Sequence, residues 1–170
     1  MSRSDWASDE IMGHILAALT PANRLAILTS MLTGLRIGDV LDLRSDVLSR
    51  ERFTVTEQKT LKRRTIRLPA KLRDDLLRMS GKIYIFESRS DPRKHRTRQA
   101  VYKDVRRAAK AFRCKGTLSC HTARKVYAVA EYRKDLDIRR VQRLLNHSSE
   151  AVTMLYAMAD EITARKRKQV

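Results

Sequence analysis

The sequence predicts a mostly helical α+β fold, a helical bundle with a small three-stranded antiparallel sheet at one edge. Two observations support this fold class: apolar residues recur with the helical period over most of the chain, and between residues 52 and 68 they alternate with polar residues, as in strands. At 170 residues, without a linker, internal repeat or low-complexity segment, the chain suits one domain with a real core. We therefore expect a single domain over residues 1–170 that ends in a basic tail at 160–170.

Two helices are predicted at the start of the chain. The first carries Ile11, Ile15 and Leu19 on one face and stops at Thr20, and Pro21 begins the second because proline is tolerated in a first helical turn. Residues 21–33 are almost wholly apolar, which predicts a core helix.

Gly34 is expected to end that helix and to precede a short one that runs to about Leu43. Arg36 lies between them. From the residues alone, the favoured interpretation of Arg36 is a surface side chain paired with Asp39 at i+3, and a functional role is the alternative.

The segment from 52 to 68 is expected to form two strands, one with Phe53 and Val55 and one with Ile66 and Leu68. The turn between them is basic, with four cations: Lys59, Lys62, Arg63 and Arg64. Such a cluster on one turn is better explained by a nearby phosphate backbone than by solvation alone.

Pro69 then begins a helix with Leu72 and Leu76 inward, which ends near Gly81, and residues 83–86 suggest the third strand. Residues 87–98 form a polar, basic loop. The next helix, from about Thr97 to Arg113, has one apolar stripe and one acid, Asp104, on a face that is otherwise basic. A solvated helix mixes both signs there, so we expect this face to contact DNA. The DNA-contacting residues predicted from the loop and helix are Arg93, Lys94, Arg96, Arg98, Lys103, Arg106, Arg107 and Lys110.

The last third of the chain brings two imidazoles, a cation and a phenol together. His121 and Arg124 are three residues apart, which places them on one helical face. His147 follows an apolar helix end, and Tyr156 falls two turns into the next helix. These side chains would make a plausible phosphate site.

The charge favours a nucleic-acid partner. The chain has 37 Lys and Arg against 19 Asp and Glu, a net charge of +18 and a pI near 10.7. A polyphosphate partner neutralises such charge; a membrane surface is the competing explanation, but no apolar run could span a bilayer and no signal peptide is recognisable, so we expect a cytoplasmic protein. Cys114 and Cys120 have no second pair to form a zinc site and are interpreted as reduced thiols, so no metal is expected.

The motifs in this order resemble the catalytic domain of the tyrosine recombinases, the phage integrase family, over about residues 8–160. The stretch TGLRIGDVLDLR looks like the family's first arginine motif, EQKT before TIRLP like its lysine hairpin, HTAR like its His-x-x-Arg box and LLNHSS like its Leu-Gly-His-Ser motif. By this resemblance the catalytic residues are Arg36, Lys59, His121, Arg124, His147 and the nucleophile Tyr156.

Two departures from the family pattern touch no catalytic position. Asn146 stands where Gly is usual, and Lys125 follows Arg124 where His is common. The core-binding domain that family members usually carry before the catalytic domain is absent here, so we expect either an excised fragment or a minimal recombinase.

The resemblance implies site-specific recombination through a 3′-phosphotyrosyl intermediate, without metal or other cofactor. Tyr156 would attack the scissile phosphate while His121 accepts its proton, and Lys59 would protonate the leaving 5′-oxygen. Arg36 and Arg124 would bind the nonbridging oxygens, with a further hydrogen bond from His147. The partner implied is double-stranded DNA, on which the chain would form a homo-tetramer from free monomers, with accessory DNA-bending proteins as possible further partners.

Two other functions remain open from the sequence. One is a type IB topoisomerase-like enzyme that relaxes DNA with a similar set of residues. The other is a noncatalytic or degenerate DNA-binding module of a mobile element. Retention of all six catalytic residue types favours an active recombinase, and integration or excision of a mobile element is favoured by analogy.

Overall fold

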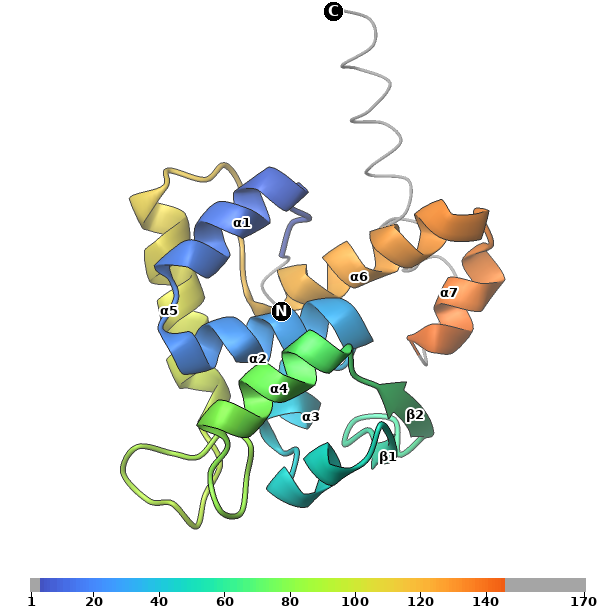
Figure 1. Cartoon of the computed structure of the whole chain (residues 1–170). Coiled ribbons are helices and arrows are strands. Elements are labelled where there is room, and N and C mark those ends of the chain that lie inside the picture. The colour runs from blue at the N-terminus through green and yellow to red at the C-terminus, as the bar shows by residue number, and fades with distance from the viewer. Residues whose placement is uncertain (1–3, 146–170) are drawn as a thin grey trace, which may run out of the picture.

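Helix α2 (Pro21–Thr33) lies at the centre of the fold and packs against α1, α3, α4 and α6 (Figure 1). The computed structural model describes residues 4–145. The remaining elements are α1 (Asp9–Ala18), α3 (Ile37–Leu41), the 3-10 helix η1 (Ser45–Ser49), β1 (Arg52–Thr56), β2 (Arg63–Arg67), α4 (Ala70–Met79), α5 (Arg98–Ala111), α6 (Cys120–Asp135) and α7 (Ile138–Leu144). The mostly helical fold with a small antiparallel sheet is thus confirmed.

The hydroxyl-bearing residues of α2, Thr29, Ser30 and Thr33, are buried, and their hydroxyl groups are hydrogen-bonded. Thr29 Oγ1 donates to the Leu25 carbonyl at 2.8 Å, and Ser30 Oγ donates to the Leu35 carbonyl at 2.7 Å. The second bond crosses the end of the helix, where Gly34 adopts a left-handed φ of 67°. Glycine accepts this conformation without steric cost, so the chain can turn sharply into α3.

The sheet has two strands where three are predicted. β1 and β2 pair antiparallel, with Phe53 opposite Ile66 and both side chains buried. The segment predicted as a third strand makes only an isolated bridge between Arg44 and Tyr84. The consecutive residues Ile85 and Phe86 are both fully buried. Tyr84 pairs with Arg44, which precedes η1, and not with a residue of β1 or β2, so the segment does not extend the sheet.

Helices α5 and α6 begin with side-chain caps. Thr97 Oγ1 accepts from the Ala100 amide at 3.2 Å at the start of α5. At α6, Ser119 Oγ accepts from the His121 amide at 3.2 Å, while the Ser119 amide donates to Thr122 Oγ1 at 3.1 Å. These reciprocal bonds fix the first turn of α6, the turn that carries the HTAR motif.

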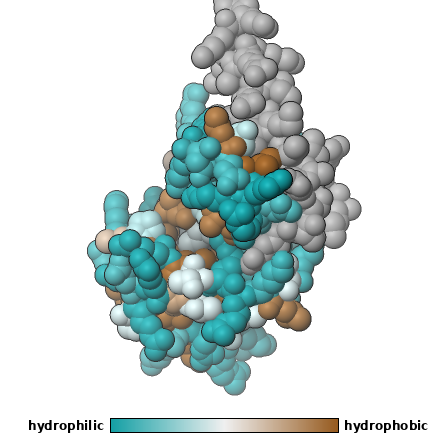
Figure 2. Space-filling view, turned by 90° about the vertical axis from the view of Figure 1, so that its right-hand side faces the viewer, coloured by the Kyte–Doolittle hydropathy of each residue, from teal (hydrophilic) through white to brown (hydrophobic). Residues whose placement is uncertain are grey.

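Helix α7 packs against the C-terminal half of α6 through a small apolar cluster that includes Tyr127, Ala128, Val141 and Leu145. The side of the molecule that carries α7 and β2 is otherwise largely hydrophilic, with small apolar areas between the polar ones (Figure 2). Among residues 4–145, no helix is both long and apolar enough to cross a membrane.

Candidate active site

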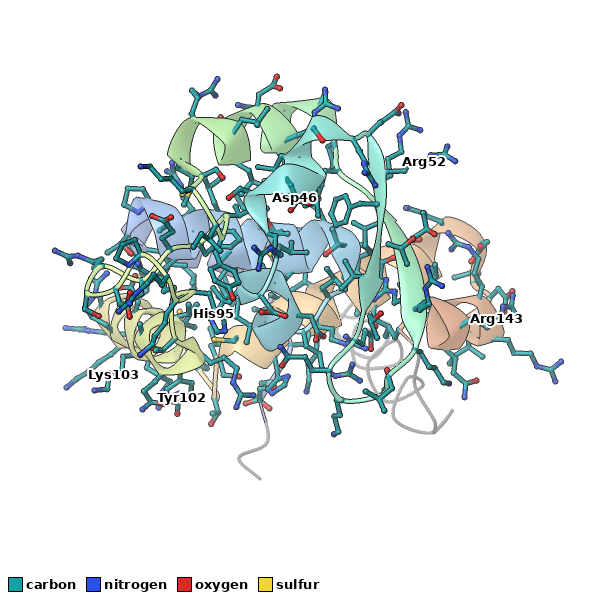
Figure 3. All side chains as sticks on the ribbon, turned by 90° about the horizontal axis from the view of Figure 1, so that it is seen from below. Asp46, Arg52, His95, Tyr102, Lys103 and Arg143 are labelled. Atoms are coloured by element: carbon teal, nitrogen blue, oxygen red, sulfur yellow. The ribbon has the colours of Figure 1, made fainter. Side chains whose placement is uncertain are left out.

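Four of the six predicted catalytic residues lie in the described part of the chain. Arg36 is the N-cap residue of α3, Lys59 lies in the turn between β1 and β2, and the other two, His121 and Arg124, lie in the first turns of α6. Figure 3 views the molecule from the side on which α3, the β1–β2 hairpin and the start of α6 are seen together. His147 and Tyr156, like the predicted tail at 160–170, lie outside the described residues.

A buried carboxylate stands at the centre of this region. Glu57, immediately after β1, is 0% exposed, and its Oε2 atom forms a salt bridge with Arg36 Nη1. Its Oε1 atom accepts from Arg64 Nη1 at 3.1 Å, and Thr60 Oγ1 donates to Oε2 at 3.1 Å. The observed salt bridge of Arg36 is therefore with Glu57, where the simpler sequence interpretation paired it with Asp39.

Asp39 instead connects α3 to the hairpin through a hydrogen bond. Its Oδ1 atom accepts from the Gln58 amide at 2.9 Å, while Oδ2 is buried without a hydrogen-bond partner among residues 4–145. Burial raises the pKa of Asp39, and the neighbouring charge of Glu57 acts in the same direction although Gln58 and Arg36 oppose it. For Glu57, burial alone would also raise the pKa, but Arg124, Arg64 and Arg36 together lower it.

Arg124 is buried, with 6% of its surface exposed, and is only partly satisfied. Its Nη2 atom donates to the Leu145 carbonyl, while Nη1 has no hydrogen-bond partner in the described part of the protein. Burial, followed by the positive charge of Arg36, lowers the pKa of Arg124 to about 10. A buried guanidinium with an open donor beside a second arginine is suited to binding an anion.

His121 is poised to remain neutral. Although the residue reaches the surface, the surrounding protein desolvates its imidazole, and this lowers its pKa from 6.5. The positive charges of Arg124 and Arg36 lower it further. A neutral imidazole at the positive end of α6 can accept a proton.

The hairpin turn presents Lys59 at its surface. The Glu57 amide donates to the Lys62 carbonyl at 3.0 Å, the Leu61 amide donates to the Glu57 carbonyl at 2.8 Å, and Leu61 adopts a positive φ of 54°. These bonds fix the base of the turn. Lys59, Lys62 and Arg63 are exposed, so their ammonium and guanidinium groups are accessible to a ligand.

Among the other residues predicted to contact DNA, Arg64 differs from the prediction. Its guanidinium is directed inward, where Nη2 donates to the Thr33 carbonyl at 2.8 Å and Nη1 binds Glu57. Only 9% of the side chain is exposed. Its position in β2, next to the exposed Arg63, turns it toward the end of α2, so the alternation of the strand separates two cations that the sequence groups together.

A polar hollow of about 520 Å³ lies between α2, α5 and the loop before α5, and Arg89, Arg96, Lys103 and Arg107 are among its lining residues. Arg96 Nε donates to Asn23 Oδ1 at 2.6 Å. Lys103 projects from α5 toward solvent (Figure 3). The other predicted contacts, Arg93, Lys94, Arg98, Arg106 and Lys110, are exposed.

The sequence interpretation did not identify Glu57 or Asp39 as site residues. A signal for Glu57 was present: it continues the i, i+2 series of Phe53 and Val55, which points to the core. An acid on the buried face of a strand requires a cationic partner, and the basic residues nearby supply one. Among residues 4–145, no group of three or more His, Cys, Asp or Glu could hold a metal ion.

The sequence is similar to those of known proteins. A sequence model of the Phage integrase family matches residues 8–162. A probable integrase/recombinase, YoeC, from Bacillus subtilis (strain 168) is 35% identical over 143 residues, which cover 81% of this chain and 78% of that protein. A tyrosine recombinase from Thermosipho africanus (strain TCF52B) is 28% identical over 162 residues, 89% of this chain but only 56% of that protein.

Solved structures share the fold at low sequence identity. The XerH recombinase bound to a palindromic difH substrate, in a post-cleavage complex, has a TM-score of 0.75 at 20% identity and covers 98% of this chain. A lambda integrase tetramer bound to a Holliday junction has a TM-score of 0.73 at 23% identity and covers 92%. The catalytic domain of bacteriophage HP1 integrase has a TM-score of 0.68 at 20% identity and covers 92%. This chain spans 53% of the XerH chain, 48% of the lambda chain and 88% of the HP1 chain.

Proposed function

Because the chain belongs to the phage integrase family, we propose that it is a site-specific DNA recombinase that cleaves and rejoins strands through a 3′-phosphotyrosyl intermediate. The substrate would be double-stranded DNA. By likeness to the lambda integrase tetramer on a Holliday junction, we propose that this chain also works as a tetramer on DNA, and that the integration or excision of a mobile element is the outcome.

One observation carries this proposal: Arg124 is buried, is close enough to Arg36 for the two charges to interact, and has an Nη1 donor without a partner in residues 4–145. Bringing like charges together in a protein interior is costly unless anions balance them. Glu57 and Asp39 balance part of the charge. A phosphodiester seated between the two arginines would balance more, and would satisfy the open donor.

The chemistry follows from these groups. The Tyr156 oxygen attacks the scissile phosphorus, the bond from phosphorus to the 5′-oxygen breaks, and a phosphotyrosine forms. His121 takes the phenolic proton, and Lys59 gives a proton to the departing 5′-oxygen. The two arginines stabilise the charge that develops on the nonbridging oxygens, in the manner of preorganised electrostatic catalysis.

The remaining basic residues would hold the DNA backbone. Lys62 and Arg63 are exposed beside Lys59 on the hairpin, and Lys103 and Arg106 are exposed on α5. Their positions on two separate elements would allow phosphates on both sides of the cleavage point to be bound. Such contacts raise affinity without reading sequence, so they account for binding and not for the choice of site.

The test is a covalent-trapping assay. A nicked duplex loses the short fragment that carries the 5′-hydroxyl, so cleavage becomes irreversible and leaves the protein attached to DNA. We expect a covalent band from the wild-type protein and none from Tyr156→Phe, with DNA binding unchanged in that variant. Tyr102→Phe, a change of the same kind at an exposed position of α5, serves as the matched control and should leave the band intact. A band that persists in Tyr156→Phe would contradict the assignment of the nucleophile.

A further inference from the structure

We propose that Glu57 is a positioning residue for strand cleavage, whose buried carboxylate holds Arg36 and the hairpin that carries Lys59 in one fixed arrangement. The inference rests on the proposed function, because it assigns roles in phosphoryl transfer to the two residues that Glu57 would align. Glu57 itself would not touch the phosphate, since its carboxylate is fully buried and negatively charged.

The two carboxylate oxygens have different cationic partners. Oε2 binds Arg36 Nη1, at the start of α3, and Oε1 accepts from Arg64 Nη1 at 3.1 Å, in β2. The side chains of these arginines are 19% and 9% exposed, so water screens the contacts little. Glu57 therefore acts as a bridge between two elements, in contrast to a surface ion pair that joins two mobile side chains.

The bridge extends to a third element through Arg64. Its Nη2 atom donates to the Thr33 carbonyl at 2.8 Å, at the C-terminal end of α2. Thr33 and Arg36 flank the turn at Gly34. Through Arg64, Glu57 thus connects the end of α2 to the hairpin, while through Arg36 it connects the start of α3 to the same hairpin.

The same residue closes the base of the Lys59 turn. The Glu57 amide donates to the Lys62 carbonyl, its carbonyl accepts from Leu61, and its carboxylate accepts from Thr60 at 3.1 Å. Backbone and side chain of one residue therefore fix the turn from inside, and Lys59 extends from it into solvent. A displacement of Glu57 would move Lys59 relative to Arg36.

The alignment matters because the two residues are assigned to different oxygens of one phosphate. Arg36 would bind the nonbridging oxygens while Lys59 protonates the leaving oxygen, so both must fit the same transition state. Misplacement of catalytic groups by about 1 Å can slow a reaction roughly 100-fold. Glu57→Gln keeps the size of the side chain but leaves Arg36 and Arg64 without the anion between them, which weakens both contacts.

The test compares Glu57→Gln with Glu51→Gln under single-turnover conditions on the nicked duplex. Glu51 is the matched control, because it lies one residue before β1 and pairs with Arg67 in β2, but is 58% exposed. We expect Glu57→Gln to form the covalent adduct about 10- to 100-fold more slowly, with DNA affinity retained, and Glu51→Gln to stay within about twofold of wild type.

A second substrate distinguishes the contribution of Lys59 to the reaction from that of Arg36. Sulfur in place of the 5′-bridging oxygen gives a thiolate leaving group, which departs without a proton donor. We expect this substrate to recover part of the rate of Glu57→Gln, because the contribution of Lys59 is bypassed while that of Arg36 is still impaired. A defect that is equally large with sulfur would overturn the link to Lys59.

A structural readout keeps the inference separate from the proposed function. Amide hydrogen exchange at residue 57 and at Leu61, the two amides that close the turn, should be faster in Glu57→Gln than in wild type, and unchanged in Glu51→Gln. If wild-type protein forms no adduct, the proposed function fails, and equal exchange rates in Glu57→Gln and wild type would then overturn the positioning role as well.

Some results of the adduct assay would contradict the positioning role of Glu57. A wild-type or faster rate for Glu57→Gln would overturn the inference, and a faster rate would identify Glu57 as a competitor of phosphate for Arg36. If Glu57→Gln does not fold, Glu57→Asp replaces it, since the charge remains but the side chain is one methylene shorter and cannot span Arg36 and Arg64 as before. A wild-type rate in a folded Glu57→Asp protein would equally overturn the inference.

Discussion

Arg124 donates a hydrogen bond to the carbonyl of Leu145 and so ties the start of α6 to the end of α7, across 21 residues of sequence. The same guanidinium keeps its Nη1 atom without a partner in the described part of the chain. One side chain thus fixes local structure with one nitrogen and offers the other to a ligand. The link also connects Arg124 to the segment that leads toward His147.

This double use predicts that Arg124→Lys impairs both stability and reaction. A lysine ammonium can replace one hydrogen bond but not a planar fork that serves a carbonyl and a phosphate. We expect adduct formation to fall by about 100- to 1000-fold, as for the loss of other transition-state donors. The free energy of unfolding, measured by urea denaturation, should fall by about 1–3 kcal/mol. Arg139→Lys, on the exposed face of α7, is the control and should change neither quantity; an unimpaired Arg124→Lys enzyme would refute the role.

The proposed role of His121 predicts that the rate of DNA cleavage falls at acidic pH, which gives the pH profile an acidic limb. Its pKa is lowered below 6.5, first by burial and then by Arg124, so the imidazole is mainly neutral at pH 7. If it accepts the phenolic proton, the rate of adduct formation should be sustained down to pH 6.5 and fall only as the pH drops through the lowered pKa. The limb should be absent in His121→Gln, which we expect to react slowly, and present in His14→Gln, a substitution at an exposed position of α1. A His121→Gln protein that retains the limb would assign it to another group.

Because the hairpin carries exposed cations, we expect the affinity for DNA to depend on the salt concentration. Lys62 and Arg63 follow Lys59 in the hairpin and carry two charges that a phosphate backbone would neutralise. The double variant Lys62→Gln/Arg63→Gln should reduce the slope of log K against log salt by about 1.8, at about 0.9 for each lost phosphate contact. The control removes the same charge from α4, by Lys71→Gln/Arg78→Gln, and should leave the slope nearly unchanged. Equal slopes for the hairpin variant and wild type would exclude these two contacts.

Much of this site could be predicted from the sequence because its motifs are local. The His-x-x-Arg box is a helical spacing that puts His121 and Arg124 in neighbouring turns, and the turn at Gly34 is a local backbone requirement, so both features could be predicted before the fold was known. The catalytic roles of Arg36 and Arg124 came from the family resemblance and stay predictions. The inward orientation of Arg64 could not be predicted from the sequence. Whether it faces DNA or the interior depends on the pairing of β2 with β1 and on the distant end of α2, which no local pattern encodes. The third predicted strand failed for a related reason, since whether residues 83–86 pair with β1 or β2 depends on tertiary packing.

The environment of Asp104 predicts that the folded protein loses stability in acid. This buried carboxylate on α5 accepts hydrogen bonds from Asn23 at 2.7 Å and from the Thr20 amide at 3.0 Å. Burial alone would raise its pKa, but these bonds and Arg107 lower it below 3.8. A lowered pKa in the folded state contributes stability at pH values above 3.8, which is lost as the pH falls through the folded pKa.

Asp104→Asn should therefore lower the free energy of unfolding by about 1–3 kcal/mol at pH 7, where a charged acceptor is replaced by a neutral amide. The difference from wild type should shrink as the pH falls from 3.8 through the lowered pKa of folded Asp104, because its carboxylate is then protonated and both side chains are uncharged. Urea denaturation at pH 7, 5 and 3 measures it. Asp74→Asn, exposed on α4, should differ little from wild type throughout. A difference for Asp104→Asn that stays constant with pH would show that the charge contributes nothing.

Replacement of glycine by alanine should have opposite effects on stability at two positions, Gly34 and Gly13. Gly34 has a left-handed φ of 67°, and a Cβ atom there would overlap the ring of Tyr127. Gly34→Ala should destabilise the protein by about 1–3 kcal/mol or more, because a strained backbone is added to a steric clash. It should also slow adduct formation, since the turn at Gly34 positions Arg36. Gly13, inside α1, has nothing within 4 Å of a Cβ atom, so Gly13→Ala should stabilise the protein by about 0.5–1 kcal/mol. Thermal unfolding of the two variants measures both effects, and destabilisation of equal size would show that the turn at Gly34 does not require glycine.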